Sequence, residues 1–215
     1  MIIAIDGPAA SGKGTLARRL ARHYGLAYLD TGGLYRATAL RALLAGDDPA
    51  DPKSAEAAAR RVVPQDLADP RLREERVAQA ASVVAAIPSV RQALLAFQRR
   101  FAESPPEGAR GAVLDGRDIG TVVCPGADAK LFITAGVEAR ARRRFKELQE
   151  SGIEVIYEHV LQDMKDRDAR DMHRRTAPLA PADDALVLDT TTLDADAALR
   201  AAVDYIGRKL PVEPR

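Results

Sequence analysis

Near its amino terminus the chain reads Gly7-Pro8-Ala9-Ala10-Ser11-Gly12-Lys13-Gly14-Thr15, which fits the pattern G-x-x-x-x-G-K with a threonine two places after the lysine. A short apolar, β-branched run at residues 2–5 precedes this stretch, and a helical pattern at residues 13–24 follows it. A strand, a glycine-rich turn and a helix in this order open a βαβ unit. The sequence therefore predicts an α/β fold that begins almost at the first residue.

The glycine-rich stretch has the composition of a phosphate-binding loop, or P-loop. Its glycines let backbone N–H groups turn toward a polyphosphate, and the following helix presents its positive end to the same anion. Lys13 reaches the β- and γ-phosphates as a mobile point charge, so we assign it a catalytic role. We expect the whole stretch to contact ATP: Gly7, Pro8, Ala9, Ala10, Ser11, Gly12, Lys13, Gly14 and Thr15.

The loop departs from the strict motif at the position after the lysine. A Ser or Thr usually stands there and ligates Mg²⁺, whereas this chain has Gly14. Thr15 can instead hydrogen-bond an inner phosphate, which leaves Mg²⁺ held mostly by phosphates and waters. We therefore expect Mg²⁺ to enter with ATP and to have no direct protein ligand. Asp30 and Asp115, both at predicted strand ends, could hold its waters.

Composition restricts the setting in which the chain works. Its 215 residues suit one domain with small insertions, and a net charge of +1 argues against a nucleic-acid partner. Cys124 is the only cysteine, which excludes an internal disulfide and favours a reducing compartment; we expect it to be a small packing residue. No stretch approaches the ~20 apolar residues of a membrane span, and residues 1–6 lack the features of a signal peptide. We expect a cytoplasmic monomer without a membrane partner.

Short apolar runs and helical patterns alternate along the rest of the chain. This alternation predicts a P-loop parallel sheet flanked by helices, with a small insert and a mobile lid. We predict further strands at 27–29, 112–114, 130–133 and 186–188, and helices at 34–44, 54–62, 72–87, 89–103, 137–149, 158–171 and 194–209. We divide the chain into a core (1–45, 110–150 and 180–215), an insert (46–109) and a lid (151–179).

Two polar clusters follow predicted strands, where open α/β sheets bind ligands. In the first, Thr31 begins a helix and Arg36 lies one turn in, which suits an anionic acceptor; a capping threonine and a solvated arginine are the alternative. In the second, Arg117 and Asp118 follow Asp115-Gly116 in a tight turn. They place a phosphate-binding guanidinium beside a hydrogen-bonding carboxylate. The alternative is a plain turn with a local ion pair, which would have the same sequence pattern.

A third cluster lies in the predicted lid. The spacing places Arg167, Arg170 or Asp171, and Arg174 along one helical face, where like charges repel unless an anion sits among them. A solvated basic face is the alternative. A mobile helix that brings arginines over a triphosphate would supply the positive charge that phosphoryl transfer needs. By contrast, we interpret the three arginines at 142–144 as the solvated face of an amphipathic helix.

Taken in order along nearly the whole chain, these segments closely resemble the bacterial cytidylate kinases, which are nucleoside monophosphate kinases. The Asp-Gly-Arg-Asp and Arg-Asp-x-Arg-Asp segments are specific to that family within the group. The resemblance implies transfer of the ATP γ-phosphoryl group to CMP or dCMP, giving CDP or dCDP and ADP, in pyrimidine nucleotide metabolism. The matching segments are residues 5–15, 30–36, 115–123, 167–171, 177–179 and 185–191.

The resemblance also implies a role for each matching residue. Arg36, Arg117 and Arg174 would hold the CMP phosphate, and Arg167 and Asp171 would contact the ribose. Arg167 and Arg174 would also face the transferred phosphoryl group, which gives them a catalytic role beside Lys13. The residues implied to read the cytosine edge are Ser82, Arg91 and Asp118, with Thr31 beside them.

The sequence departs from the family pattern at about residues 62–75. Related chains carry a longer insert there, whereas residues 64–73 read here as a short loop. We therefore expect a trimmed monophosphate-binding insert, which leaves selectivity between CMP and UMP open. The alternatives are a P-loop kinase of another small acceptor (UMP, AMP, shikimate or dephospho-coenzyme A) and a nucleotide-binding switch without transfer. The Asp-Gly-Arg-Asp cluster favours CMP.

Overall fold

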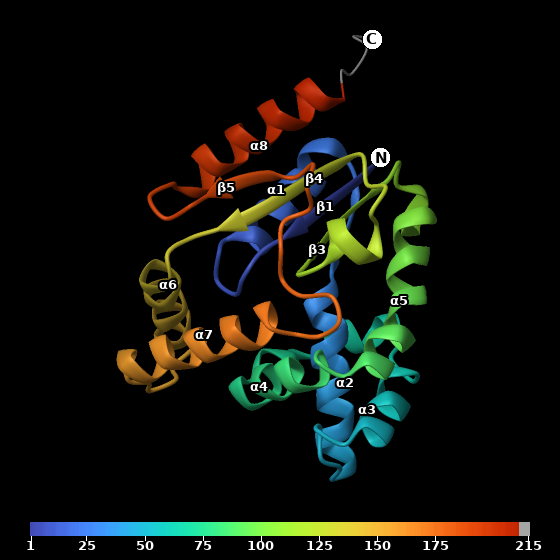
Figure 1. Ribbon diagram of the computed structural model, residues 1–215, viewed down its shortest axis with the longest axis vertical. Coiled ribbons are helices and arrows are strands. Elements are labelled where there is room, and N and C mark those ends of the chain that lie inside the picture. The colour runs from blue at the N-terminus through green and yellow to red at the C-terminus, as the bar shows by residue number, and fades with distance from the viewer. Residues whose placement is uncertain (211–215) are drawn as a thin grey trace.

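The computed structural model describes residues 1–210 and is built around a five-stranded sheet (Figure 1). All neighbouring strands are parallel, in the order β2-β3-β1-β4-β5, so the predicted parallel sheet is confirmed. Residues 211–215, the end of the predicted core segment 180–215, lie outside the described residues. The strands are β1 (Ile2–Asp6), β2 (Ala27–Asp30), β3 (Ala112–Gly116), β4 (Ala129–Thr134) and β5 (Leu186–Asp189).

Side chains of β1 alternate between two apolar layers. Ile3 and Ile5 pack with α1 (Lys13–Tyr24) and α8 (Ala195–Lys209), whereas Ala4 packs with α2 (Thr31–Ala45) and α5 (Pro88–Glu103) on the other face. A parallel sheet needs such cover on both faces, because its strands are apolar on both sides. A strand covered on both faces has a near-continuous apolar sequence, and residues 2–5 of β1 are all apolar.

The remaining helices extend from the carboxyl edge of the sheet and around it. Asp30 caps α2, since its carboxylate accepts a hydrogen bond from the Gly33 N–H, and Gly46 ends that helix in a left-handed conformation (φ 77°). These helices are α2 (Thr31–Ala45), α3 (Pro52–Ala59), α4 (Glu75–Val84), α5 (Pro88–Glu103), α6 (Val137–Glu150) and α7 (Tyr157–Met172).

Residues 64–73 do not form the predicted short loop but two 3₁₀ helices, Pro64–Ala68 and Pro70–Arg73. Helix α4 consequently begins at Glu75, three residues after the predicted start at residue 72. The two prolines explain the difference. Proline suits the first turn of a helix but lacks the N–H of an interior position, so each one begins a new short helix.

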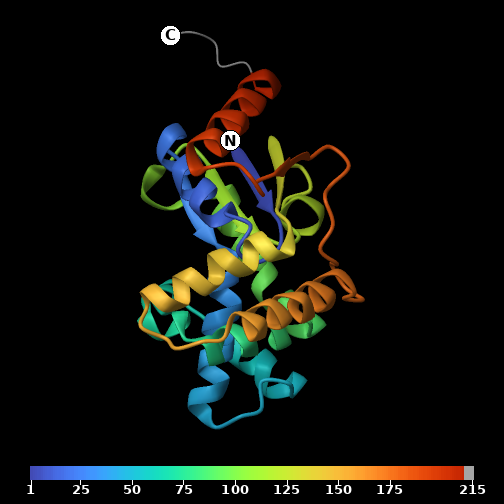
Figure 2. The same ribbon diagram turned by 90° about the vertical axis from the view of Figure 1, so that its left-hand side faces the viewer.

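Two groups of helices face each other across the carboxyl edge of the sheet. In Figure 1, α3 and α4 lie below the sheet beside α2, and α6 and α7 lie to the left, with α7 running alongside α4. Figure 2 shows α6 and α7 side by side. Their seam is an apolar cluster formed by Ala141 and Leu148 of α6 with Val160 and Met164 of α7, and Ala9 of the P-loop joins it. The division into core, insert and lid stays a prediction.

No single helix within residues 1–210 has both the length and the apolarity of a membrane span. The bent pair α4–α5 meets those criteria only when its two helices are counted together across a 100° bend.

Candidate functional site

The P-loop follows β1 and wraps around the start of α1. Gly7 has φ 150°, and a Cβ there would lie 2.0 Å from the carbonyl oxygen of Ile133, so no larger residue fits. Gly12 caps α1 in a left-handed conformation (φ 87°). The Ser11 hydroxyl is fully buried and has no hydrogen-bond partner among the described residues. Such a buried polar atom, beside a helix amino terminus, fits an oxyanion.

Lys13 lies at the centre of this loop. Its Nζ donates to the Pro8 carbonyl at 3.3 Å and lies 3.8 Å from the Asp115 carboxylate. The pKa of Lys13 is lowered to about 8, mainly by burial and also by the Arg117 guanidinium, while Asp115 acts in the opposite direction. An incoming phosphate would relieve this penalty, because a nearby anion favours the charged ammonium.

The two carboxylates considered for Mg²⁺ stand opposite each other on neighbouring strands, since Asp30 of β2 is in register with Asp115 of β3. Asp30 pairs with Arg36 at 2.5 Å. Burial raises the pKa of Asp115, against the influence of Lys13, and its Oδ2 accepts a hydrogen bond from the Tyr28 hydroxyl at 3.3 Å. No group of three His, Cys, Asp or Glu side chains within residues 1–210 could hold a metal ion. Two facing carboxylates beside the phosphate-binding lysine supply oxygen atoms of the kind that accept hydrogen bonds from the waters of a phosphate-bound Mg²⁺.

Two hollows meet at Lys13. The larger is a cleft of about 2280 Å³ between the P-loop, α4, α6 and α7, and the smaller is a pocket of about 220 Å³ at the ends of β2 and β3. Both are lined by Lys13, Arg36, Arg117 and Arg167, so positive charge is concentrated where the hollows join. The smaller pocket is lined by most of the residues expected to bind the acceptor: Thr31, Arg36, Ser82, Arg91, Arg117, Arg167 and Asp171.

The other two expected acceptor residues do not line the smaller pocket. Asp118 forms a buried ion pair with Arg91, which does line it. Arg174 donates to the Ala85 carbonyl at 3.5 Å, and Ala85 also belongs to the pocket wall. Both side chains therefore lie directly behind the wall, one residue removed from the hollow.

The prediction that Arg167, Arg170 or Asp171, and Arg174 lie along one helical face is wrong for Arg174, which lies beyond the end of the helix. Helix α7 ends at Met172, and Ala177 has a positive φ of 51° before Pro178. The chain thus turns after the helix, and Arg174 folds back so that its Nε donates to the Asp171 carbonyl at 3.3 Å. The cluster is still formed, but by a helix and the turn that follows it.

The charges in this cluster are incompletely matched. Asp171 accepts a hydrogen bond from the Arg117 Nε at 2.9 Å; burial alone would raise its pKa, but Arg117, Arg167 and Arg174 lower it. Burial lowers the pKa of Arg167 to about 10, and the neighbouring Arg117 guanidinium adds to the effect. Arg167 Nε and Arg174 Nη2 are buried without a partner among the described residues. An anion with several oxygens would satisfy these donors.

The residues expected to read the base are paired with one another or with neighbours. Asp118 pairs with Arg91, whose guanidinium lies 5.6 Å from the centre of the Tyr35 ring. Ser82 accepts a hydrogen bond from the Arg170 Nε at 3.2 Å. The Thr31 hydroxyl donates to the Asp115 carbonyl at 2.8 Å, which joins α2 to β3 and leaves the hydroxyl oxygen able to accept a hydrogen bond.

Sequence reasoning missed Asp6, the last residue of β1. Its carboxylate accepts hydrogen bonds from the Ile119 N–H at 2.7 Å and the Gly120 N–H at 2.8 Å. It thereby holds the turn that carries Asp118. Burial raises the pKa of Asp6 to about 7, although the two backbone hydrogen bonds act in the opposite direction. Its position directly before the P-loop was the only signal in the sequence.

Tyr28 and Arg18 were also missed, although both line the cleft and the smaller pocket. The Arg18 guanidinium lies 5.8 Å from the centre of the Tyr28 ring, and the Tyr28 hydroxyl contacts Asp115. Neither belongs to a motif, and only the register of β2 with β3 brings Tyr28 to Asp115.

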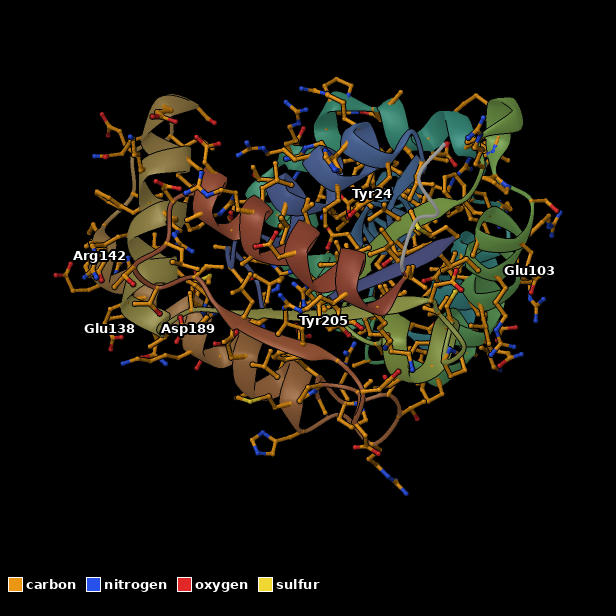
Figure 3. The ribbon with its side chains drawn as sticks, turned by 90° about the horizontal axis from the view of Figure 1, so that it is seen from above. Tyr24, Glu103, Glu138, Arg142, Asp189 and Tyr205 are labelled. Atoms are coloured by element: carbon orange, nitrogen blue, oxygen red, sulfur yellow. The ribbon has the colours of Figure 1, made fainter. Side chains whose placement is uncertain are left out.

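The interpretation of the arginines at 142–144 as a solvated face is correct for one of them. Arg142 is exposed at the outer edge of α6, near Glu138 (Figure 3). Arg143 instead donates to the Thr190 carbonyl and hydroxyl, and Arg144 pairs with Glu75 of α4. Residues on one turn of a helix point in different directions, so two of the three face protein. Cys124 is buried, and burial raises its pKa to about 11, as expected for a packing residue.

Comparison with known proteins agrees with the resemblance. The family described as cytidylate kinase matches residues 3–208. A cytidylate kinase of Paramagnetospirillum magneticum is 64% identical over 208 residues, which is 97% of this chain and 98% of that protein, and one of Rhodospirillum rubrum is 59% identical over 209 residues with the same coverage. The crystal structure of an uncharacterized protein from Eubacterium ventriosum matches with a TM-score of 0.52 at 17% identity. The match covers 96% of this chain and 98% of that chain, and at this identity it supports the fold alone. The chain therefore belongs to the cytidylate kinase family.

Proposed function

We propose that this protein transfers the γ-phosphoryl group of ATP to CMP or dCMP, yielding ADP and CDP or dCDP. The observation that carries the proposal is that a cleft lined by the P-loop adjoins a smaller pocket lined by most of the acceptor residues, with Lys13, Arg117 and Arg167 in the walls of both. A triphosphate in the cleft and a monophosphate in the smaller pocket would bring donor and acceptor together at one point.

Phosphoryl transfer needs positioning and positive charge more than covalent chemistry. Lys13 reaches the junction from α1, and Arg167 reaches it from α7. Because both charges are buried before substrate arrives, they need little reorganisation when charge develops on the transferred group. Arg174, which has an unpartnered buried Nη2, is the third catalytic charge of this proposal.

The acceptor would be held by its phosphate, sugar and base in turn. Arg36 and Arg117 would bind the phosphate together with Arg174, and Asp171 with Arg167 would contact the ribose. Cytosine presents an amino donor and two acceptors, the ring N3 and the carbonyl oxygen O2. Asp118 and Arg91 offer the complementary groups, with Ser82 and Thr31 beside them, and their present pairing would be exchanged for pairing with the base.

We propose that ATP enters with Mg²⁺. The P-loop residues, Gly7 to Thr15, would bind the phosphates, while Asp30 and Asp115 would hold waters of the ion. When bound, Mg²⁺ would neutralise negative charge on the phosphates. Asp115 lies 3.8 Å from Lys13 and its pKa is raised by burial, and a cation beside it would favour its ionised form.

We also propose that the protein works in the cytoplasm as a monomer, without nucleic-acid or membrane partners. The single buried Cys124 and the net charge of +1 support this setting. Sedimentation at micromolar concentration tests the monomer, since a dimer would double the apparent mass.

The proposed reaction is tested with a panel of acceptors in a coupled assay of ADP release. We expect CMP and dCMP to give the highest kcat/KM, with UMP, AMP, shikimate and dephospho-coenzyme A lower. A different best acceptor would refute the proposed substrate. ADP release that no acceptor accelerates would refute the transferase itself and indicate a nucleotide-binding switch.

A further inference from the structure

A buried ion pair outside the predicted site residues joins the two helices that flank the cleft. Arg140 lies in the first turn of α6, and Asp168 lies in the second half of α7. Two parallel hydrogen bonds connect them, from Arg140 Nη1 to Asp168 Oδ1 at 3.1 Å and from Nη2 to Oδ2 at 2.5 Å. The side chains are only 5% and 12% exposed. The pair is therefore bidentate and largely removed from water.

The same guanidinium also holds the P-loop. Arg140 Nη1 donates to the Ala9 carbonyl at 3.3 Å, and Nε donates to the Ala135 carbonyl, just beyond β4, at 2.8 Å. The neighbouring residue of the loop, Ala10, has a positive φ of 55°, which a residue with a side chain adopts only when its surroundings impose it. One side chain thus connects the sheet edge, the P-loop and α7.

The orientation of the Asp168 side chain determines the orientation of the side of α7 that carries Arg167 and Asp171. Asp168 directly follows Arg167, which lines both hollows, and it lies one turn before Asp171, which accepts a hydrogen bond from Arg117. Successive residues of a helix are separated by a fixed rotation. Holding the Asp168 carboxylate against Arg140 therefore fixes the rotation of α7 and, with it, the direction in which Arg167 points.

Stability alone gives little reason for such a pair. The helices α6 and α7 already share an apolar seam of Ala141, Leu148, Val160 and Met164. Burying two charges costs most of what their attraction returns, and an apolar pair of similar volume often stabilises a fold as well. A planar guanidinium with two hydrogen bonds adds geometric definition instead.

We propose that Arg140 and Asp168 are a positioning pair, which sets the distance and rotation of α7 relative to the P-loop so that Arg167 meets the transferred phosphoryl group. This inference rests on the function proposed above. Neither residue is expected to touch substrate through its own side chain, because the carboxylate and the guanidinium are hydrogen-bonded to each other and neither residue lines the cleft.

The test compares the effect of breaking the pair in two backgrounds. Asp168→Asn and, separately, Arg140→Lys are introduced into the wild-type chain and into an Arg167→Ala chain, and kcat is measured with radiolabelled ATP at saturating CMP. In the wild-type background we expect kcat to fall about 10- to 100-fold, as a small misplacement of a catalytic group can cost. In the Arg167→Ala background the same change should lower kcat by less than about 2-fold, because the group through which the pair acts is gone.

Arg41→Lys is the matched control. Arg41 also makes two hydrogen bonds to one carboxylate, that of Asp66, at 3.0 and 2.9 Å, but neither side chain lines the cleft or the pocket. Its kcat should stay within about 2-fold of wild type in both backgrounds. Thermal unfolding checks that each variant is folded, and Arg140→Lys, which keeps the charge, carries the test should Asp168→Asn fail to fold.

An equal reduction of kcat in both backgrounds, or no reduction in the wild-type background, would show that the pair is only structural and would overturn the inference. A wild-type protein that does not phosphorylate CMP is a distinguishable result, since it refutes the proposed function and with it the premise on which the pair was assigned.

Discussion

The ammonium of Lys13 lies 3.8 Å from the carboxylate of Asp115, a separation too long for a hydrogen bond. The nearest hydrogen-bond partner of Lys13 is the Pro8 carbonyl, at 3.3 Å. Lys13 thus lies near the Asp115 carboxylate and near the Arg117 guanidinium, and neither group holds its ammonium through a hydrogen bond. This arrangement leaves the ammonium available to a phosphate group.

Replacement of Lys13 by alanine should lower kcat about 10²- to 10³-fold, because a preorganised charge at the transferred group is lost. Binding of CMP to the free protein should change little, since the other cations of the smaller pocket remain. Steady-state kinetics and calorimetric CMP titration check the two parts. Lys53→Ala is the control, as Lys53 is exposed on α3, and it should behave as wild type. An undiminished kcat in Lys13→Ala would contradict the catalytic role.

The affinity for ATP should fall as the pH rises through about 8. Burial lowers the pKa of Lys13 to about 8 in the free protein, so the ammonium that attracts phosphate is progressively lost above that pH. Binding should accordingly take up a proton on the alkaline side, because phosphate raises the pKa of the bound lysine. Calorimetric ATP titration on either side of pH 8, in buffers of different ionisation enthalpy, measures both effects. Lys13→Arg keeps its charge, so an identical pH dependence in that variant would refute this assignment.

Asp118→Asn should raise the KM for CMP about 10-fold and reduce the preference for CMP over UMP, because the carboxylate that accepts from the cytosine amino group becomes an amide. The variant also leaves the buried Arg91 without its counter-ion, so its thermal midpoint should fall. Parallel assays with CMP and UMP separate the two effects: a general loss of stability lowers both activities equally. Unchanged selectivity would show that Asp118 does not read the base.

Asp6 should make the protein less stable as the pH rises from about 4 to about 7. Burial raises its folded pKa from 3.8 to about 7, so in this window the folded state binds more protons than the unfolded state, and the free energy of unfolding falls with increasing pH. Chemical denaturation of wild type and Asp6→Asn at several pH values tests this, because the difference between them should decline across the same window. A difference that is constant with pH would mean that Asp6 is ionised throughout.

Two nucleotides should bind at once. The cleft and the smaller pocket adjoin along a shared wall that includes Lys13, Arg117 and Arg167, but the smaller pocket also has walls of its own, among them Arg91 and Asp171. A non-transferable ATP analogue at saturation should therefore leave CMP binding in place. A CMP titration followed by calorimetry in the presence of the analogue measures this. Complete exclusion of CMP by the analogue would leave a single nucleotide site and contradict the proposed ternary complex.

Local sequence patterns determined the framework of this protein. The order of strand, P-loop and helix, the remaining strands and most helix boundaries depend on neighbours within a few residues: apolar alternation, the Asp30 cap and the glycines that end helices. The same holds for residues 7–15, where glycine spacing dictates how the loop can turn. Family membership followed from motifs of this local kind.

Contacts between distant segments were decided only by the tertiary structure. Tyr28 meets Asp115 across 87 residues, Arg140 meets Asp168 across 28, and Asp6 reaches Gly120 across 114. Arg174 lies beyond the end of α7 and reaches the site because the chain folds back there. No spacing rule encodes such pairs, because they depend on strand register, helix packing and the path of turns, which exist only once the whole chain is folded.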